Sequence, residues 1–207
     1  MPILSQKTIG SKQQIAVWQI EEDVEVLLNM LGISEADRQI LDGFKLDTRK
    51  KEWLASRILL QHLLGHYPQL AYSANGKPYL QNQSQYVSIS HTKGYAAVSV
   101  SDKPTALDIE LCSDRVLKVA NRFVHPNEEA FVEPHLRKEY LTLLWCAKET
   151  LYKYFDEFGV IFKEQFLVSP IEIAECGNLN CQFLSGDRLE RLELTYEVNA
   201  NFTLVYC

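Results

Sequence analysis

Apolar positions recur at helical spacing in two long segments of the chain. The first segment predicts a helix from Asp47 to about Leu64, which Gly65 ends, and the second predicts a helix from about Arg137 to Phe155. Shorter apolar runs beside capping or helix-breaking residues predict further helices over 24–31, 35–41, 116–123 and 127–132. Each half of the chain therefore has one long helix.

Polar and apolar positions alternate in the segments that surround these helices, which predicts β-strands. The strands predicted in the first half are 15–20, 86–91 and 95–100, with a hairpin signal at Asn75-Gly76. The strands predicted in the second half are 105–111, 165–168, 182–184, 192–197 and 202–206. We therefore expect an α+β fold of two similar lobes, residues 1–104 and 105–207, each a long helix packed on a small, mostly antiparallel sheet.

The predicted strand 105–111 carries two acidic residues between apolar ones. Successive side chains of a strand point to opposite faces, so Asp108 and Glu110 share one face. Leu107, Ile109 and Leu111 share the other face and can anchor the strand in a core. Two neighbouring carboxylates are costly unless a cation lies between them. Taken alone, the acidic pair is also compatible with an exposed strand face.

The second long helix has a third carboxylate at a position that can complete this pair. Trp145, Glu149 and Lys153 lie on one stripe of the helix, and Lys148 lies beside it. If the stripe faces the strand, three carboxylates converge, with lysines at the rim. Carboxylate oxygens suit a hard cation such as Mg²⁺, which keeps some of its waters and binds phosphate.

Composition narrows the class of protein. The chain has 207 residues, 46% of them hydrophobic, which is enough for a substantial core. The net charge of −6 gives no general basic surface for nucleic acid. The five cysteines show no metal-binding spacing, which favours reduced thiols in a cytoplasmic protein. No segment is long and apolar enough to span a membrane, and the N-terminus shows no signal peptide. We expect a monomer.

Four short motifs occur in order along the chain. They are Gly76-Lys77-Pro78-Tyr79, Ser88-Ile89-Ser90-His91-Thr92, Leu107-Asp108-Ile109-Glu110 and Trp145-Cys146-Ala147-Lys148-Glu149-Thr150. In these motifs the chain resembles the 4′-phosphopantetheinyl transferase superfamily, in particular its pseudo-dimeric surfactin-synthetase-activating type. The family motifs read G-K-P, S-x-S-H-[ST], [GA]-[VIL]-D-[VI]-E and W-x-x-K-E-[AS]. Each motif alone is weak, and their joint order makes the resemblance specific.

The resemblance implies two α+β halves related by a pseudo-twofold axis, with coenzyme A between them. It implies an enzyme of the holo-acyl-carrier-protein synthase type. Such an enzyme transfers the 4′-phosphopantetheine arm of coenzyme A to a serine hydroxyl of an apo acyl, peptidyl or aryl carrier protein and releases 3′,5′-ADP. It further implies a Mg²⁺ ion held by Asp108, Glu110 and Glu149.

The resemblance also implies roles for individual residues. Asp108, Lys148, Glu149 and Lys153 would be catalytic: the lysines would add positive charge near the pyrophosphate, and Glu149, or a metal-bound water that it orients, would take the serine proton. Glu128 would have a lesser role near the site. The residues expected to contact coenzyme A are Lys51, Arg57, Lys77, Pro78, Ser90, His91, Lys148 and Lys153. His91 taken alone is also compatible with a structural histidine.

Two features depart from the family pattern. The loop 154–161 is acidic and has one glycine, where many relatives have a loop rich in glycine and lysine. Thr150 replaces the usual Ala or Ser. Two other functions stay open at this point: a non-catalytic relative that binds coenzyme A or a carrier protein, and a Mg²⁺-dependent phosphohydrolase that uses the same acidic cluster.

Overall fold

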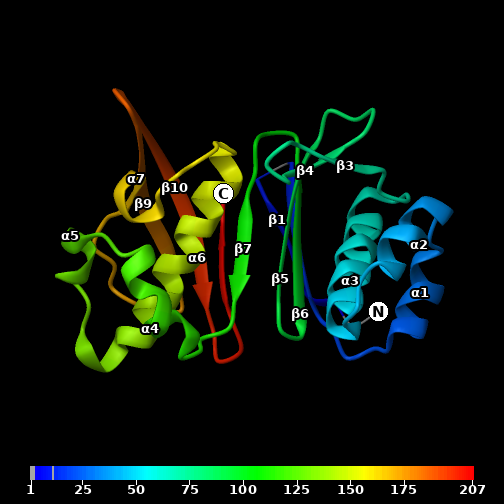
Figure 1. The fold of residues 1–207 in the computed structure, drawn as a ribbon, viewed down its shortest axis with the longest axis horizontal. Helices are drawn as coiled ribbons and strands as arrows, with labels where there is room; N and C mark the ends of the chain where they lie inside the picture. Colours follow the sequence, from blue (N-terminus) through cyan, green and yellow to red (C-terminus); the bar gives the residue numbers. More distant parts are fainter. Residues whose placement is uncertain (1–2, 11) are drawn as a thin grey trace. The chain divides into compact units, whose positions relative to one another are not determined.

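The computed structural model describes residues 3–10 and 12–207. The chain divides into two compact units, Met1–Thr105 and Ala106–Cys207, and each unit contains an antiparallel sheet and helices (Figure 1). The α+β class predicted from the sequence is therefore confirmed. Within the described residues, no helix combines the length and the apolar character that crossing a membrane requires.

The first unit is built on a four-stranded antiparallel sheet with the strand order β1-β2-β6-β5. Its strands are β1 (Ile3–Ile9), β2 (Gln13–Gln19), β5 (Tyr86–Thr92) and β6 (Tyr95–Ser101). A small second sheet pairs β3 (Leu70–Tyr72) with β4 (Pro78–Leu80). Because β4 packs against β5, the segment that begins with Lys77 and Pro78 adjoins the strand that carries Ser90 and His91.

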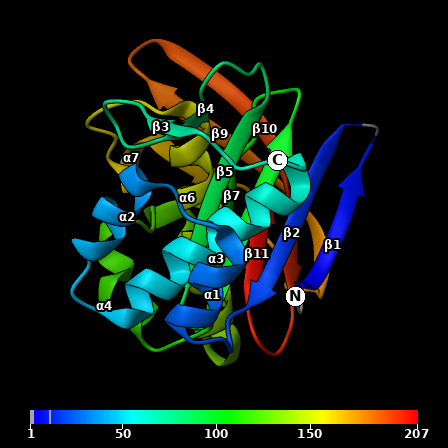
Figure 2. The ribbon, with the colours of Figure 1, turned by 90° about the vertical axis from the view of Figure 1, so that its right-hand side faces the viewer.

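Three helices complete the first unit. They are α1 (Val24–Leu31), α2 (Glu35–Asp42) and α3 (Asp47–Leu64). Helix α3 lies against β2, β5 and β6, and α1 lies against α3 (Figure 2). Fully buried side chains such as Trp18, Leu54 and Leu59 fill the space between helices and sheet. Burial of this apolar surface holds α3 on the sheet and fixes which of its residues face β5.

The second unit is built on a five-stranded antiparallel sheet with the order β7-β11-β10-β9-β8. The strands are β7 (Leu107–Glu110), β8 (Phe166–Val168), β9 (Cys176–Ser185), β10 (Arg188–Val198) and β11 (Thr203–Tyr206). Strand β7 forms one edge of the sheet, with Asp108 opposite Val205 of β11. The edge position leaves one side of β7 without a strand neighbour in this sheet.

Helix α6 (Arg137–Phe155) packs on β7 and β11, which sets the stripe containing Glu149 against the acidic strand. Its buried residues include Leu144 and Leu151, which join Phe123, Phe166 and Phe183 in the core. The shorter helices of this unit are α4 (Arg115–Val119), η1 (Ala120–Arg122), α5 (Pro126–Glu129), η2 (Pro134–Leu136) and α7 (Phe162–Gln165).

The predicted long helices are confirmed as α3 and α6, and several strand bounds differ from the prediction. The strand predicted over 105–111 is shorter and ends at Glu110. The prediction missed β1, and it placed only parts of β9 and β10 in strands. The predicted helix over 116–123 is divided into α4 and η1, because the backbone of Val119 leaves the helical region, and the predicted helix over 127–132 ends at Glu129.

Candidate active site

Asp108 is held on β7 by contacts with two residues of α6. The Sγ atom of Cys146 donates to the backbone oxygen of Asp108 at 3.1 Å, so the helix and the strand are joined at this residue. The Nζ atom of Lys153 donates to Asp108 Oδ1 at 2.7 Å and to the Leu107 oxygen at 3.0 Å. Asp108 is 4% exposed, so this carboxylate lies in the interior beside a cation from α6.

Glu110 is the second acidic residue of β7, and it is half-buried at the end of the strand. The indole nitrogen of Trp145 donates to Glu110 Oε1 at 3.2 Å. The Trp145 ring packs between Phe123 and Phe162, with ring centroids 5.1 and 5.9 Å away. The aromatic group therefore fixes the orientation of the indole that contacts this carboxylate.

The pKa of Glu149 on α6 is raised, and both acidic residues of β7 contribute to the shift. Burial, together with the negative charges of Asp108 and Glu110, raises the pKa of Glu149 to about 7, although Lys153 opposes the shift. The same two charges help burial to raise the pKa of the Cys146 thiol. The structure thus brings Asp108, Glu110 and Glu149 into one negative field, as their spacing in the sequence suggested.

Lys148 points away from this field into the core. It is fully buried, and its ammonium donates to the Phe123 oxygen at 2.6 Å, to Glu128 Oε2 at 2.7 Å and to the Phe162 oxygen at 3.3 Å. Burial lowers the pKa of Lys148, and the charge of Glu128 opposes this. With three acceptors around its three N–H groups, the side chain has a structural role here. Its predicted contact with a phosphate and its predicted catalytic role stay predictions.

Glu128 is the partner that makes the burial of this lysine tolerable. It is 3% exposed, and its Oε2 also accepts from the backbone N–H of His125 at 2.7 Å. Its Oε1 accepts from the backbone N–H of Val168 at 2.9 Å. The pair of Glu128 and Lys148 therefore joins α5, β8 and α6 with the backbone of two aromatic residues, Phe123 and Phe162, that enclose Trp145.

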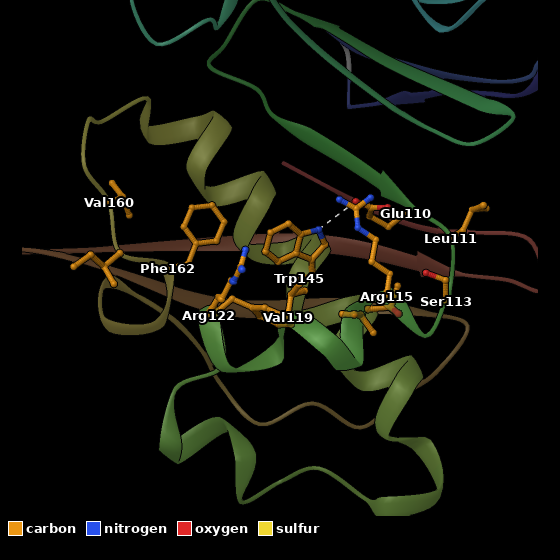
Figure 3. A pocket seen from close by; sticks show the side chains of 13 residues that line it. Glu110, Leu111, Ser113, Arg115, Val119, Arg122, Trp145, Val160 and Phe162 are labelled. Atoms are coloured by element: carbon orange, nitrogen blue, oxygen red, sulfur yellow. Dashed lines mark hydrogen bonds between the residues drawn. The ribbon is translucent and has the colours of Figure 1, made fainter. Parts of the chain in front are cut away.

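A cavity of about 490 Å³ opens beside Glu110 and Trp145 in the second unit. Figure 3 shows Trp145 in its wall, with the indole nitrogen directed to Glu110, and the labelled side chains of Arg115, Arg122 and Phe162 around the space. The lining is mostly apolar, with two arginines that bring positive charge. The sequence did not predict this cavity. Its lining comes from α6 and from two segments that precede and follow α6 in the sequence.

The residues of the first unit that are predicted to contact coenzyme A differ in their burial and in their partners. Arg57 is 4% exposed; it lies 3.4 Å from the centre of the Trp53 ring and donates to Tyr72 Oη at 2.7 Å. Burial lowers its pKa, although the nearby tyrosines and Asp37 oppose the shift. This guanidinium packs between α3 and β3, and its predicted contact with a phosphate stays a prediction. Lys51 is half-buried and bonds to Asp23 at 3.0 Å.

Ser90 and His91 lie at the end of β5, where Ser90 is buried and His91 is half-buried. His91 faces α3, with its ring between Arg49 and Glu52. Lys77 and Pro78 follow Gly76, whose φ of 84° closes the turn before β4. The predicted set Lys77, Pro78, Ser90 and His91 therefore comes from adjoining strands. Arg49 and Glu52 were not predicted as site residues.

Residues 104–207, half of the chain, match the sequence model of the 4′-phosphopantetheinyl transferase superfamily. The chain belongs to the 4′-phosphopantetheinyl transferase superfamily. The matched region contains β7 and α6, and hence all three carboxylates of the negative field.

Three relatives support the same grouping. The chain is 26% identical to the 4′-phosphopantetheinyl transferase AcpT of Salmonella typhimurium over 137 residues, which are 62% of this chain and 71% of that protein. It is 29% identical to the 4′-phosphopantetheinyl transferase of Bacillus subtilis over 131 residues, 58% of each chain. It is 24% identical to the 4′-phosphopantetheinyl transferase gsp of Aneurinibacillus migulanus over 138 residues, 64% of this chain and 54% of that protein. The chain thus spans little more than half the length of the last two relatives.

Phosphopantetheinyl transferases use coenzyme A and typically a divalent metal, so the fit of a cation to these residues matters. Among residues 3–10 and 12–207, no group of three or more His, Cys, Asp or Glu side chains is arranged to hold a metal ion. The donor chemistry nevertheless suits a hard cation, because all three groups offer carboxylate oxygens, and burial together with the charges of Asp108 and Glu110 raises the pKa of Glu149. Lys153 supplies the positive charge next to Asp108 in this structure.

Replacing Glu149 by Gln is expected to stabilise the metal-free protein above pH 7. The folded state raises the pKa of Glu149 from 4.5 to about 7 and so binds its proton more tightly than the unfolded state. This contribution to stability is fully present below pH 4.5 and is lost as the pH rises through about 7, whereas Gln has no charge to bury at either pH. Urea unfolding with a chelator present should show a gain for Glu149→Gln at about pH 8 and little change at about pH 4.

The control is Glu193→Gln, which neutralises an exposed glutamate on β10. Its free energy of unfolding should follow that of the wild type at both pH values. An equal effect of the two substitutions at high pH would contradict the shared negative field around Glu149.

Proposed function

We propose that the protein transfers the 4′-phosphopantetheine group of coenzyme A to a serine hydroxyl of an apo carrier protein and releases 3′,5′-ADP. The observation that carries the proposal is the field of Asp108, Glu110 and Glu149 between β7 and α6, within the region that matches the superfamily. The relatives from Salmonella typhimurium and Bacillus subtilis are named 4′-phosphopantetheinyl transferases, which supports the proposal. The holo-acyl-carrier-protein synthase type is part of the proposal.

Asp108, Glu110 and Glu149 would hold the divalent cation, which we propose is Mg²⁺. When bound, such a cation neutralises charge on the pyrophosphate oxygens and on the leaving 3′,5′-ADP. Lys153 is a quarter exposed and lies at Asp108, so its ammonium can also neutralise phosphate charge close to the carboxylates. These residues would act by placing positive charge around a negatively charged transition state.

Glu149 is also the group best suited to accept the serine proton. A general base is most effective when its pKa lies near the working pH, and burial together with the charges of Asp108 and Glu110 raises the pKa of Glu149 to about 7 in the metal-free protein. A bound cation would lower that value again by compensating the neighbouring charges. Glu149 would then act on the hydroxyl directly or through a water that it orients.

The cavity beside Glu110 gives a place for the apolar part of the substrate. Its wall includes Trp145 and Phe162, which offer flat apolar surfaces, and Arg115 and Arg122 can meet negative charge at the edge. We propose that the pantetheine chain occupies this cavity while its phosphate lies at the carboxylate field. In the first unit, Lys77, Pro78, Ser90 and His91 would contact the nucleotide part, with Lys51 as a further cation.

The deciding experiment incubates the protein with an apo carrier protein, coenzyme A and Mg²⁺ and measures the intact mass of the carrier. The expected result is a gain of one phosphopantetheine group, which disappears when a chelator removes the metal. A panel of acyl, peptidyl and aryl carriers would identify the partner. Binding of coenzyme A without any transfer would identify a binding relative, and hydrolysis of coenzyme A without carrier modification would identify a phosphohydrolase.

The pseudo-twofold relation of the two units, the monomeric state and the cytoplasmic location stay predictions.

A further inference from the structure

Three polar side chains meet between α3 and β5 in the first unit. Arg49 and Glu52 lie one turn apart on α3, and both reach His91 on β5. Nδ1 of His91 is 3.1 Å from Glu52 Oε2, and its Nε2 contacts Nη1 of Arg49. Arg49 and Glu52 are themselves 3.7 Å apart. Each ring nitrogen of His91 therefore has its own partner.

The chemistry of the partners assigns the tautomer of His91. A guanidinium can only donate, so the nitrogen that faces Arg49 must act as an acceptor. Nδ1 then carries the ring proton and donates it to Glu52. A neutral imidazole with its proton on Nδ1 satisfies both contacts, and the carboxylate of Glu52 then fixes the orientation of the ring.

The three side chains differ in their access to solvent. The side chain of Glu52 is 17% exposed, whereas those of His91 and Arg49 are 32% and 44% exposed. Burial raises the pKa of Glu52, and Arg49 opposes the shift. The group therefore has a carboxylate on its inner side and two nitrogen-bearing side chains on its outer side. An anion arriving from solvent would meet Arg49 and His91 first.

We propose that Glu52 is a positioning residue that couples binding of the 3′-phosphate of coenzyme A to proton uptake by His91. When the phosphate arrives, the Arg49 guanidinium donates to it instead of to Nε2. Nε2 then takes up a proton from solvent, and the new Nε2–H donates a hydrogen bond to a phosphate oxygen, while Nδ1–H stays hydrogen-bonded to Glu52. The imidazolium lies between two anions, which stabilises its charge. The identity of the ligand rests on the proposed function.

Other titratable groups near this end of β5 would oppose the protonation of His91 or leave it unaffected. Lys93 and Tyr95 lie in the β5–β6 hairpin, and Ala96 is the residue paired with His91. On the side of β4, the chain brings Lys77 and Tyr79. A nearby ammonium disfavours an imidazolium, so among these groups Glu52 is the one whose negative charge offsets the cost of protonating His91.

The test follows the two ring nitrogens of His91 by long-range ¹H–¹⁵N NMR in the full-length protein. The chain has five histidines, so a His91→Gln variant assigns the signals. The pH is set about one unit above the ordinary histidine pKa of about 6.5. In the wild type, the free protein should show the Nδ1–H tautomer, and saturating coenzyme A should move both nitrogens to imidazolium shifts. Coenzyme A without its 3′-phosphate should not move them.

Glu52→Gln keeps the shape of the side chain and removes its charge. The variant should keep His91 neutral when coenzyme A is added, and its affinity for coenzyme A should fall about tenfold or more. Its affinity for the 3′-dephospho ligand should change much less. Glu52→Asp should recover part of the imidazolium signal, which separates lost charge from lost structure. The matched control is Glu25→Gln, an exposed glutamate on α1, which should behave as the wild type.

Two results would overturn the proposal: a wild-type His91 that stays neutral with coenzyme A bound, or a Glu52→Gln variant with the imidazolium signal and affinity of the wild type. The carrier assay separates this proposal from the proposed function. A full imidazolium response without any carrier modification would refute the transfer and support the coupling. Carrier modification with a neutral His91 would refute the coupling alone.

Discussion

Replacing Asp108 by Asn is expected to lower the rate of phosphopantetheine transfer by about 10²- to 10³-fold in saturating Mg²⁺. The substitution keeps the size of the side chain and removes one of the three charges of the field that would hold the cation. Lys153, a quarter exposed, then loses its anionic partner at Asp108 and can turn to solvent, so the fold should survive. The measurement is the initial rate of carrier modification over a range of Mg²⁺ concentrations.

The matched control is Asp114→Asn in the same unit. Asp114 lies just before α4, its side chain is 79% exposed, and its distance to Lys138 is 3.8 Å. This variant should transfer at nearly the wild-type rate. Wild-type activity of Asp108→Asn would show that the metal assignment is wrong, and an equal loss in both variants would show that the loss is not specific to the carboxylate field.

The long helices could be predicted because their signals are local. Apolar residues repeat along α3, and Gly65 ends it with a φ of 77°, a conformation that glycine adopts at little cost. The strands were harder to predict where one face has no core to meet. In β1 no residue is fully buried, so the apolar alternation that identifies a strand is weak. The polar outer face of β9 similarly hid the first part of a strand whose inner face is Leu179, Cys181 and Phe183.

The carboxylate field could be predicted because it depends on two regular periods. Residues two apart share a face of β7, and the stripe of α6 that carries Glu149 packs on that strand. The direction of Lys148 could not be predicted in this way. It follows Ala147 and precedes Glu149 on the helix surface, and only a buried acid twenty residues earlier, Glu128, explains why a lysine turns inward.

The position of Arg57 has a similar explanation. It was expected to contact phosphate because it is basic and lies in the first half of the chain. It stacks on Trp53, one turn earlier on the same helix, and its burial also depends on Tyr72 from a separate strand, which is a tertiary contact. The acidic loop after α6 shows the same limit, because Glu157 is paired at 2.8 Å with Arg188, thirty-one residues later. Its charge is thus partly compensated within the unit.

Replacing Lys148 by Met is expected to lower the free energy of unfolding by about 3–5 kcal/mol. The substitution leaves the buried carboxylate of Glu128 without its cation, and it removes the donor shared by the Phe123 and Phe162 oxygens. Small domains have only about 5–15 kcal/mol in total, so the loss should be large in urea unfolding. The control on the same helix is Lys138→Met, whose exposed pair with Asp114 should cost at most about 1 kcal/mol.

A double variant, Lys148→Met with Glu128→Gln, distinguishes a buried ion pair from two independent contacts. Removing the charge of Glu128 relieves the cost of an isolated buried anion, so the double variant should be more stable than Lys148→Met alone. The recovery should be incomplete, because a glutamine has a single acceptor oxygen for the N–H groups of both His125 and Val168. If the free-energy changes of the two single substitutions simply add up in the double variant, the coupling between Glu128 and Lys148 is refuted. If Lys148→Met left the stability unchanged and weakened coenzyme A binding, the result would support the predicted contact of Lys148 with phosphate. Replacing a lysine that only stabilises the fold should instead lower the stability first.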